Sequence, residues 1–216
     1  MKSELPADKV YFGKAATQYD KGRRGNPVTD EDDEAIARFL SEFSTGATIG
    51  DAPCGTGRAL AKVLELGLIF RGADISQDMI EVCRTKVPEG HSVQLDLADA
   101  RNLPWATGSC DGLLSVKFLK WLPSNDVVLD VLKEYRRVCR GRAFINVKLK
   151  DEVKEYSFYE MLDRMRKLID RLRLGTSARY FSHEEFKGLL KAANWTIVRV
   201  EKNEASNSIV FNYILD

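Results

Sequence analysis

The sequence predicts an α/β fold, a doubly wound, mostly parallel seven-stranded sheet with an antiparallel last strand and a helical segment after the fifth strand. Short apolar runs alternate with stretches in which apolar residues recur at helical spacing, as in βαβ units with a sheet covered on both faces. The segment between the last two apolar runs is short and polar, which indicates a hairpin and an antiparallel final strand. The length of 216 residues fits one domain.

The composition is that of a soluble globular protein, with 44% hydrophobic and 30% charged residues, and it excludes a largely disordered or fibrous chain. Lys and Arg number 33 against 32 Asp and Glu, so no chain-wide field draws the protein to nucleic acid or to an anionic membrane. No apolar run is long enough for a membrane span, and the first residues lack the apolar core of a secretory signal. We therefore expect a cytoplasmic protein without a membrane span.

Metal binding and disulfide bonding are not expected. The four cysteines are widely spaced without a Cys-x-x-Cys pair, and only two histidines could join them. The cysteines are therefore predicted to be small buried hydrophobic side chains. His91 precedes the third strand and is expected at the surface. His183 follows Ser182, a predicted helix cap with Glu185 as its capping-box partner, and is expected to be structural.

The predicted elements follow from these patterns in order. Thr29 is expected to cap a first helix with an acidic first turn, Asp30 to Glu34. Strands are predicted at residues 47–52, 68–74, 92–97, 112–116, 142–148, 196–200 and 208–214. Helices are predicted at residues 57–66, 77–86, 126–138, 152–174 and 183–193. The single domain of residues 1–216 then divides into an N-terminal helical cap (1–45), a cofactor-binding core (46–150), a helical insertion (151–181) and a C-terminal helix with strands (182–216).

The turn after the first predicted strand has the features of a cofactor site. The strand ends in Asp51, the chain turns through Gly55 and Gly57, and a helix follows, so unpaired N–H groups face a ligand that small residues allow to approach. A structural turn or a dinucleotide site is the alternative. Asp74 ends the next strand, where a carboxylate accepts both ribose hydroxyls or caps a helix. Asp51 would repel a pyrophosphate and attract a cationic cofactor, and the third glycine of the dinucleotide motif is missing.

These segments resemble the class I S-adenosylmethionine (SAM)-dependent methyltransferases, in particular the small-molecule branch with the ubiquinone and menaquinone C-methyltransferases. The resemblance rests on residues 49–58 and 72–79, on 98–105 (ADARNLPW) and 109–123, and on 179–201. It implies a Rossmann-like methyltransferase fold whose helical insertion forms a lid over the substrate. It also implies SAM as the cofactor and S-adenosylhomocysteine (SAH) as the product.

The resemblance assigns roles to residues one by one. Asp51 and the backbone of Gly55 and Gly57 would hold the ammonium and carboxylate of SAM, and Asp74 would bind the ribose. Met79 would lie against the adenine, Asp99 and the backbone of Ala100 would bind its polar edge, and Ser115 and Val116 would line the methyl-transfer site. The full set of implied cofactor-binding residues is Tyr19, Asp51, Ala52, Gly55, Gly57, Asp74, Ile75, Met79, Asp99, Ala100, Ser115 and Val116.

Two departures from the family pattern concern the turn and the substrate side. Pro53 stands where the family usually has Gly, which removes one N–H from the turn. A His pair common in related enzymes is replaced by Lys120-Trp121, with Lys117 one turn earlier. Lys117 is the expected substrate-orienting residue at the catalytic site, or else a solvated residue. Six cations lie between Arg164 and Arg179 against one acid, again as part of a substrate site or a solvated face.

The predicted function is SAM-dependent methyl transfer to a small molecule, with an anionic metabolite as one option, by in-line attack on the sulfonium methyl. The alternatives are an RNA or protein methyltransferase of the same fold and a non-catalytic SAM-binding regulatory module. A nucleic acid partner is disfavoured, and the chain is expected to be a monomer or a homodimer. The substrate and the methylated atom do not follow from the sequence.

Overall fold

The computed structural model describes residues 27–149, 179–203 and 210–216. Most of the predicted insertion (151–181), the first part of the predicted helical cap, and Tyr19 lie outside the described residues. Within the described part of the chain, no helix is both long and apolar enough to cross a membrane.

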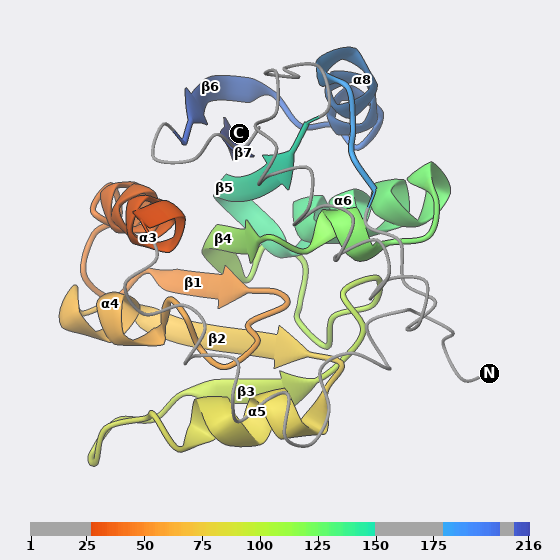
Figure 1. Cartoon of the computed structure of the whole chain (residues 1–216). Helices are drawn as coiled ribbons and strands as arrows, with labels where there is room; N and C mark the ends of the chain where they lie inside the picture. The colour runs from red at the N-terminus through yellow and green to blue at the C-terminus, as the bar shows by residue number, and fades with distance from the viewer. Residues whose placement is uncertain (1–26, 150–178, 204–209) are drawn as a thin grey trace, which may run out of the picture.

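The described elements form one seven-stranded sheet (Figure 1). Its strands are β1 (Thr48–Asp51), β2 (Ile69–Asp74), β3 (Gln94–Leu97), β4 (Cys110–Val116), β5 (Cys139–Lys148), β6 (Ile197–Lys202) and β7 (Val210–Leu215). They lie in the order β3-β2-β1-β4-β5-β7-β6. The first five pair in parallel, and β7 runs antiparallel to both neighbours, β5 and β6. The predicted doubly wound sheet with an antiparallel last strand is confirmed.

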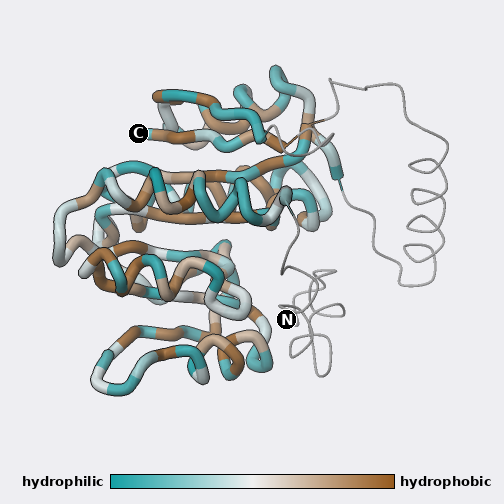
Figure 2. Tube along the Cα trace, turned by 60° about the vertical axis from the view of Figure 1, so that its left-hand side comes forward, coloured by the Kyte–Doolittle hydropathy of each residue, from teal (hydrophilic) through white to brown (hydrophobic). Residues whose placement is uncertain are grey.

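Helices pack on both faces of the sheet. They are α3 (Pro27–Leu40), α4 (Leu60–Glu65), α5 (Gln77–Arg84), the 3-10 turn η1 (Leu119–Trp121), α6 (Asn125–Val138) and α8 (His183–Ala192). One apolar cluster includes side chains of α3, α4 and α5, and the other includes side chains of α6 and α8. In Figure 2 the helices alternate between hydrophilic and hydrophobic colours along their length, as expected for elements with one buried face.

The central strands supply both apolar clusters because successive side chains point to opposite faces of the sheet. Leu113 and Ile145 pack in the cluster with α6 and α8, whereas their neighbours Leu114 and Phe144 pack in the cluster with α3, α4 and α5. All four are fully buried. This arrangement fixes the register of β4 against β5 and therefore the place where β4 ends.

Two helix starts differ from the prediction. The first helix begins at Pro27, not after Thr29, because proline is well suited to the first helical position, where no N–H bond is needed. Helix α4 begins at Leu60 instead of residue 57, since Gly57 adopts a positive φ of 79° that a right-handed helix does not allow. The turn that precedes α4 is therefore longer than predicted.

The predicted places of the two histidines and the predicted burial of the cysteines are confirmed. Ser182 and Glu185 form the predicted capping box of α8, and the Nδ1 atom of His183 lies 3.0 Å from the Tyr213 hydroxyl, a structural contact. His91 is exposed in a turn before β3. All four cysteines are buried free thiols. No group of three metal-ligating side chains occurs within residues 27–149, 179–203 and 210–216.

Candidate functional site

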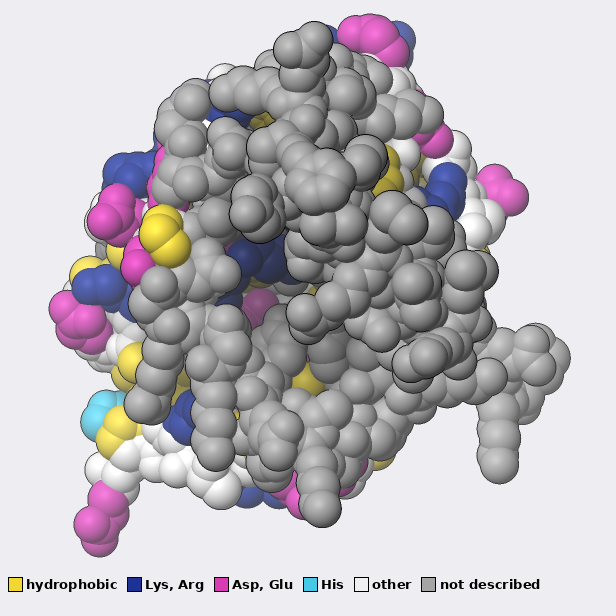
Figure 3. Space-filling model, viewed as in Figure 1, with side chains coloured by type: hydrophobic (Ala, Val, Ile, Leu, Met, Phe, Trp, Pro, Cys, Tyr) yellow, Lys and Arg dark blue, Asp and Glu magenta, His cyan; other side chains and the backbone are white. Residues whose placement is uncertain are grey.

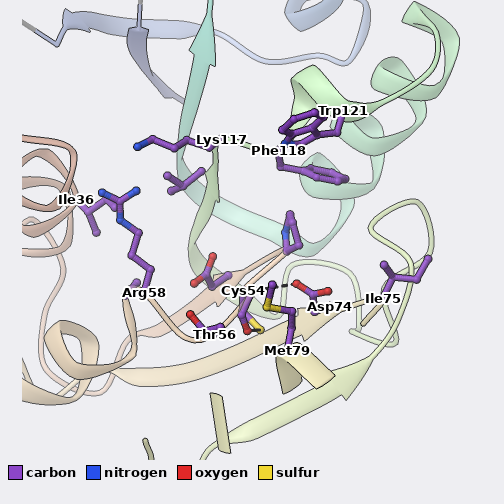
Figure 4. Close-up of a pocket in the computed structure, with 15 residues that line it drawn as sticks. Ile36, Cys54, Thr56, Arg58, Asp74, Ile75, Met79, Lys117, Phe118 and Trp121 are labelled. Atoms are coloured by element: carbon purple, nitrogen blue, oxygen red, sulfur yellow. Dashed lines mark hydrogen bonds between the residues drawn. The ribbon is translucent and has the colours of Figure 1, made fainter. Parts of the chain in front are cut away.

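The candidate site lies where β1, β2 and β4 end. These strands are parallel and adjacent in the sheet, so their carboxyl ends meet at one edge. Asp51 ends β1, Asp74 ends β2 and Val116 ends β4. The three residues line one cavity with about 830 Å³ of open space, including the part open to solvent. The cavity is shown in Figure 4, and Figure 3 shows Lys and Arg atoms beside an acidic side chain near the middle of this face.

The turn from Ala52 to Ala59 forms one wall of this cavity. Gly55 and Gly57 have φ values of 54° and 79°, which only glycine adopts without strain. A Cβ atom on Gly57 would lie 2.6 Å from the buried Sγ of Cys83 in α5, so the turn and α5 approach each other too closely for any side chain. Position 57 therefore requires glycine both for its backbone conformation and for the lack of room for a side chain.

Asp74 joins this turn to the start of α5. One carboxylate oxygen, Oδ2, accepts from the Gly55 N–H at 2.9 Å, and the other, Oδ1, accepts from the Ser76 N–H at 2.9 Å. Burial raises the pKa of Asp74, although backbone N–H donors, those of Gly55 and Ser76 included, oppose the shift. Asp51 is 4% exposed on the same cavity wall. Two buried carboxylates therefore face the same space.

A second, smaller cavity adjoins the first. Its wall includes Ala52, Ile75, Asp99 and Ala100, and Phe118 lines both cavities. The side chain of Asp99 is held by Arg101, whose backbone N–H donates to Asp99 Oδ1 at 2.9 Å and whose Nη2 lies 2.5 Å from Oδ2. Burial raises the pKa of Asp99, but the hydrogen bonds and charge of Arg101 outweigh it, so the pKa is lowered. Asp99 therefore stays ionised and can only accept hydrogen bonds.

A side chain of α6 also holds the turn in place. The hydroxyl of Tyr135 in α6 donates to the backbone carbonyl of Ala52 at 2.5 Å and lies 3.2 Å from the Ser115 hydroxyl. All three residues are buried, and burial raises the pKa of Tyr135, so this phenol stays protonated. Ser115 points to the α6 face of the sheet, so its side chain contacts Tyr135, whereas its neighbour Val116 lines the cavity.

The lining of the first cavity also includes two cations, one of them from the turn itself, and two aromatic rings. Arg58 and Lys117 line it together with Phe118 and Trp121, and Figure 4 shows both cationic side chains extending toward Ile36 of α3. Lys117 has a positive φ of 58°, which is uncommon for a residue other than glycine. The Nζ of Lys117 lies 2.7 Å from Asp32 Oδ2, and Arg58 Nη2 lies 3.7 Å from the same oxygen.

The structure thus brings together most of the predicted site residues. Asp51, Gly55, Asp74, Ile75, Met79, Val116 and Lys117 line the first cavity, and Ala52, Ile75, Asp99 and Ala100 line the second. Gly57 shapes the turn, and Ser115 lies beneath it. Tyr19 falls outside the described residues.

Sequence reasoning missed Ile36, Arg58, Phe118, Trp121 and the buried Asp32. One signal pointed to Asp32, because it stands three, four and seven residues before apolar positions of the same helix. A carboxylate on the buried face of a helix requires a partner.

Comparisons with known proteins find methyltransferases. Residues 51–145 match the family model described as a methyltransferase domain. The chain is 30% identical over 114 residues to the tRNA (carboxymethyluridine(34)-5-O)-methyltransferase of Mus musculus, covering 52% of this chain and 16% of that protein. It is 34% identical over 103 residues to the methyltransferase GfsG of Streptomyces halstedii, covering 46% of this chain and 36% of the relative. The chain thus spans well under half the length of these relatives.

Solved structures show the same fold. Magnesium protoporphyrin IX methyltransferase from Synechocystis with bound SAH aligns with a TM-score of 0.69 at 15% identity, over 97% of this chain and 96% of that chain. A SAM-dependent methyltransferase from Methanosarcina mazei aligns with a TM-score of 0.64 at 19% identity, over 82% and 95%.

Proposed function

We propose that this chain, which belongs to the class I SAM-dependent methyltransferases, transfers the methyl group of SAM to a small molecule that carries an anionic group. The observation that carries the proposal is the opposite charge of the two sides of one cavity. Asp51 and Asp74 end β1 and β2 beside the glycine turn, and the side chains of Arg58 and Lys117 extend toward Ile36 of α3 (Figure 4). A cationic cofactor and an anionic substrate would each meet complementary charge.

The residues on the turn side fit SAM. The positive-φ glycines leave room for a ligand close to the backbone, and Asp51 would attract the ammonium of the methionine part. Asp74 would accept the ribose hydroxyls through its free lone pairs, while Met79 and Ile75 would pack against the adenine. Two buried carboxylates would repel a polyphosphate, so a dinucleotide fits less well.

The side toward α3 fits an anionic group. Arg58 and Lys117 share the single buried carboxylate of Asp32, which leaves an excess of positive charge. The nearest other acid, Asp33, bonds Arg58 Nε at 2.5 Å, but its side chain is 47% exposed and water screens its charge. Phe118 and Trp121 add apolar surface, which excludes water and strengthens the attraction between the cations and a bound anion.

Methyl transfer from SAM requires the protein to align the two reactants more than to transfer a proton. SAM supplies an electrophilic methyl carbon on a sulfonium. Among the described residues that line the first cavity there is no histidine, and hydrogen bonding with Cys83 together with burial raises the pKa of Cys54 well above its usual range. Lys117 and Arg58 would hold a nucleophile that is already ionised, such as a carboxylate or phenolate, which attacks without a base.

A paired substrate panel tests the proposal. Purified chain is incubated with SAM and with metabolites offered in matched pairs, each acid beside its neutral amide or ether, and SAH release is measured. We expect SAH release with acids and at least tenfold less with their neutral partners, as for loss of one hydrogen bond to a charged group. Equal release from both members of every pair would refute the anionic preference, and no calorimetric binding of SAH would refute the cofactor.

An RNA substrate is the second candidate, because relatives from mouse and Arabidopsis thaliana are named tRNA carboxymethyluridine methyltransferases. A carboxymethyl group is also an anion and suits the same cations. Methylation of bulk tRNA that falls steeply with salt would favour this candidate, since each phosphate contact adds to the salt dependence. Activity on free acids that persists in high salt would favour the small molecule.

A further inference from the structure

We infer that Asp32 is a positioning residue for the substrate, which holds the ammonium of Lys117 at the cavity wall before the substrate arrives. The inference rests on the proposed function, in which Lys117 binds the anionic group. Asp32 lies in α3 and its side chain is fully buried. It stands on the apolar face of the helix, together with Ile36 and Phe39, so the carboxylate points toward the sheet and away from solvent.

The two oxygens of Asp32 have different partners. Oδ1 accepts from the side-chain amide of Asn146 at 3.2 Å and from that of Asn203 at 2.7 Å. Oδ2 faces the cations, with Lys117 Nζ at 2.7 Å and Arg58 Nη2 at 3.7 Å. A buried carboxylate persists only with such compensation. One oxygen therefore fixes the acid to the ends of β5 and β6, and the other is directed at two residues of the cavity wall.

Lys117 needs such a fixed point. A lysine side chain has four rotatable carbon bonds and loses considerable freedom when it is held in one place. Its backbone also adopts a positive φ directly after β4, a conformation that persists when the surroundings hold it. Because Asp32 already holds the ammonium, the entropy cost of ordering the Lys117 side chain arises when the protein folds and not when the substrate binds. An ammonium has three N–H donors, and its single ion-pair contact with Asp32 leaves donors for an anionic substrate.

Asp33 provides a matched control for charge and helix position. It is the next residue of α3 and also pairs with Arg58, with its Oδ1 2.5 Å from Nε. Its side chain is exposed, and the described contacts connect it to Arg58 but not to Lys117. A general effect of removing an acid from α3, or of loosening Arg58, would appear in both variants, whereas positioning of Lys117 depends on Asp32 alone.

The first experiment compares Asp32→Asn and Asp33→Asn in steady-state kinetics with an anionic substrate from the panel. Asn keeps an oxygen for the two amides but replaces the anionic Oδ2. We expect KM to rise about tenfold in Asp32→Asn, because an ammonium that is no longer held in place binds the anion less well, with kcat much less affected. SAH affinity in both variants and KM in Asp33→Asn should stay within about twofold of wild type.

A double-mutant cycle with Lys117→Met separates positioning from structure. If Asp32 acts through Lys117, adding Asp32→Asn to Lys117→Met changes KM by no more than about twofold. If the same tenfold rise occurs in the Lys117→Met background, Asp32 acts on the fold alone and the inference is wrong. Asp32→Glu, which keeps the charge, should bring KM back to near the wild-type value.

A measurement without substrate distinguishes failure of this inference from failure of the proposed function. The rate at which an amine-reactive acetylating reagent labels Lys117 is followed by mass spectrometry of peptides. We expect labelling several times faster in Asp32→Asn than in wild type and no change in Asp33→Asn. Equal rates in all three proteins would overturn the inference. Faster labelling in Asp32→Asn without methylation of any anion would leave Asp32 holding Lys117 and refute the proposed function instead.

Discussion

The two sides of the cavity are built in different ways. The side that fits SAM consists of the ends of two adjacent parallel strands and one turn, with Asp51, Gly55 and Asp74 close together in sequence. The side proposed for the substrate is assembled from α3, the turn, and the ends of β4, β5 and β6, through side chains that meet at Asp32. Backbone conformation dominates the first side, and buried charge dominates the second.

This difference predicts how each side fails. On the turn side, a change of backbone conformation or of a single acid should weaken SAH binding or unfold the turn. On the side toward α3, a change should alter KM for the substrate and leave SAH binding intact.

Gly57→Ala should destabilise the protein by about 2–4 kcal/mol, the sum of a left-handed backbone cost and of crowding against Cys83. Urea unfolding measures the loss. Gly188→Ala in α8 is the control, because nothing lies within 4 Å of its added Cβ, and it should stabilise by about 0.5–1 kcal/mol. In a double-mutant cycle with Cys83→Ala, the part of the stability loss that comes from crowding should disappear, and the part that comes from the backbone conformation should remain. A loss unchanged in that background would show that crowding contributes nothing.

Asp74→Ala should weaken SAH binding by about 1.5–3 kcal/mol, the cost of losing hydrogen bonds to a charged group. The variant also leaves the Gly55 N–H without its carboxylate acceptor, so the turn itself should loosen. Calorimetric titration with SAH measures the effect, with Asp78→Ala in the first turn of α5 as the control. An unchanged dissociation constant in a folded Asp74→Ala protein would contradict the assignment of the ribose site.

Tyr135→Phe should reduce the free energy of unfolding by about 1–2 kcal/mol, because the buried carbonyl of Ala52 loses its hydroxyl donor. Since Ala52 begins the turn, SAH affinity should fall as well. Tyr213→Phe removes a buried hydroxyl that contacts His183, away from both cavities, and serves as the control. Tyr213→Phe should lower stability without lowering SAH affinity. An equal loss of SAH affinity in the two variants would show that the Tyr135 hydroxyl does not position the turn.

The same contrast explains what the sequence predicts well. The alternation of strands and helices, the antiparallel β7 and the acids at the ends of β1 and β2 follow from local patterns, since period and turn residues act over a few positions. The predicted start of α4 lies too early because Gly57 has a positive φ, so the turn continues past Gly57 and the helix begins only at Leu60. Asp32 was interpreted as part of an acidic first turn, because its partners Lys117, Asn146 and Asn203 lie far away in sequence and only tertiary packing brings them together.

The smallest expected effect is a pH dependence of stability at Glu134 of α6, beside the second cavity. Its Oε1 accepts from the Leu103 N–H at 2.7 Å and lies 2.6 Å from Arg137 Nη2, so it holds the segment that lines the second cavity. Burial raises the pKa of Glu134, but the bonds from Arg137 and Leu103 outweigh it and the pKa is lowered. A lowered folded pKa means that the unfolded chain binds this proton first as the pH falls.

The contribution of Glu134 to stability is therefore complete above the ordinary glutamate pKa and is lost as the pH falls through the lower folded value. Glu134→Gln should be less stable than wild type by no more than about 1 kcal/mol near neutral pH, because Arg137 is partly exposed. The difference should shrink as the pH falls below about 4.5, the usual pKa of the side chain. Urea unfolding at several pH values measures it. A difference that stays constant into acid would show that the charge of Glu134 is not its source.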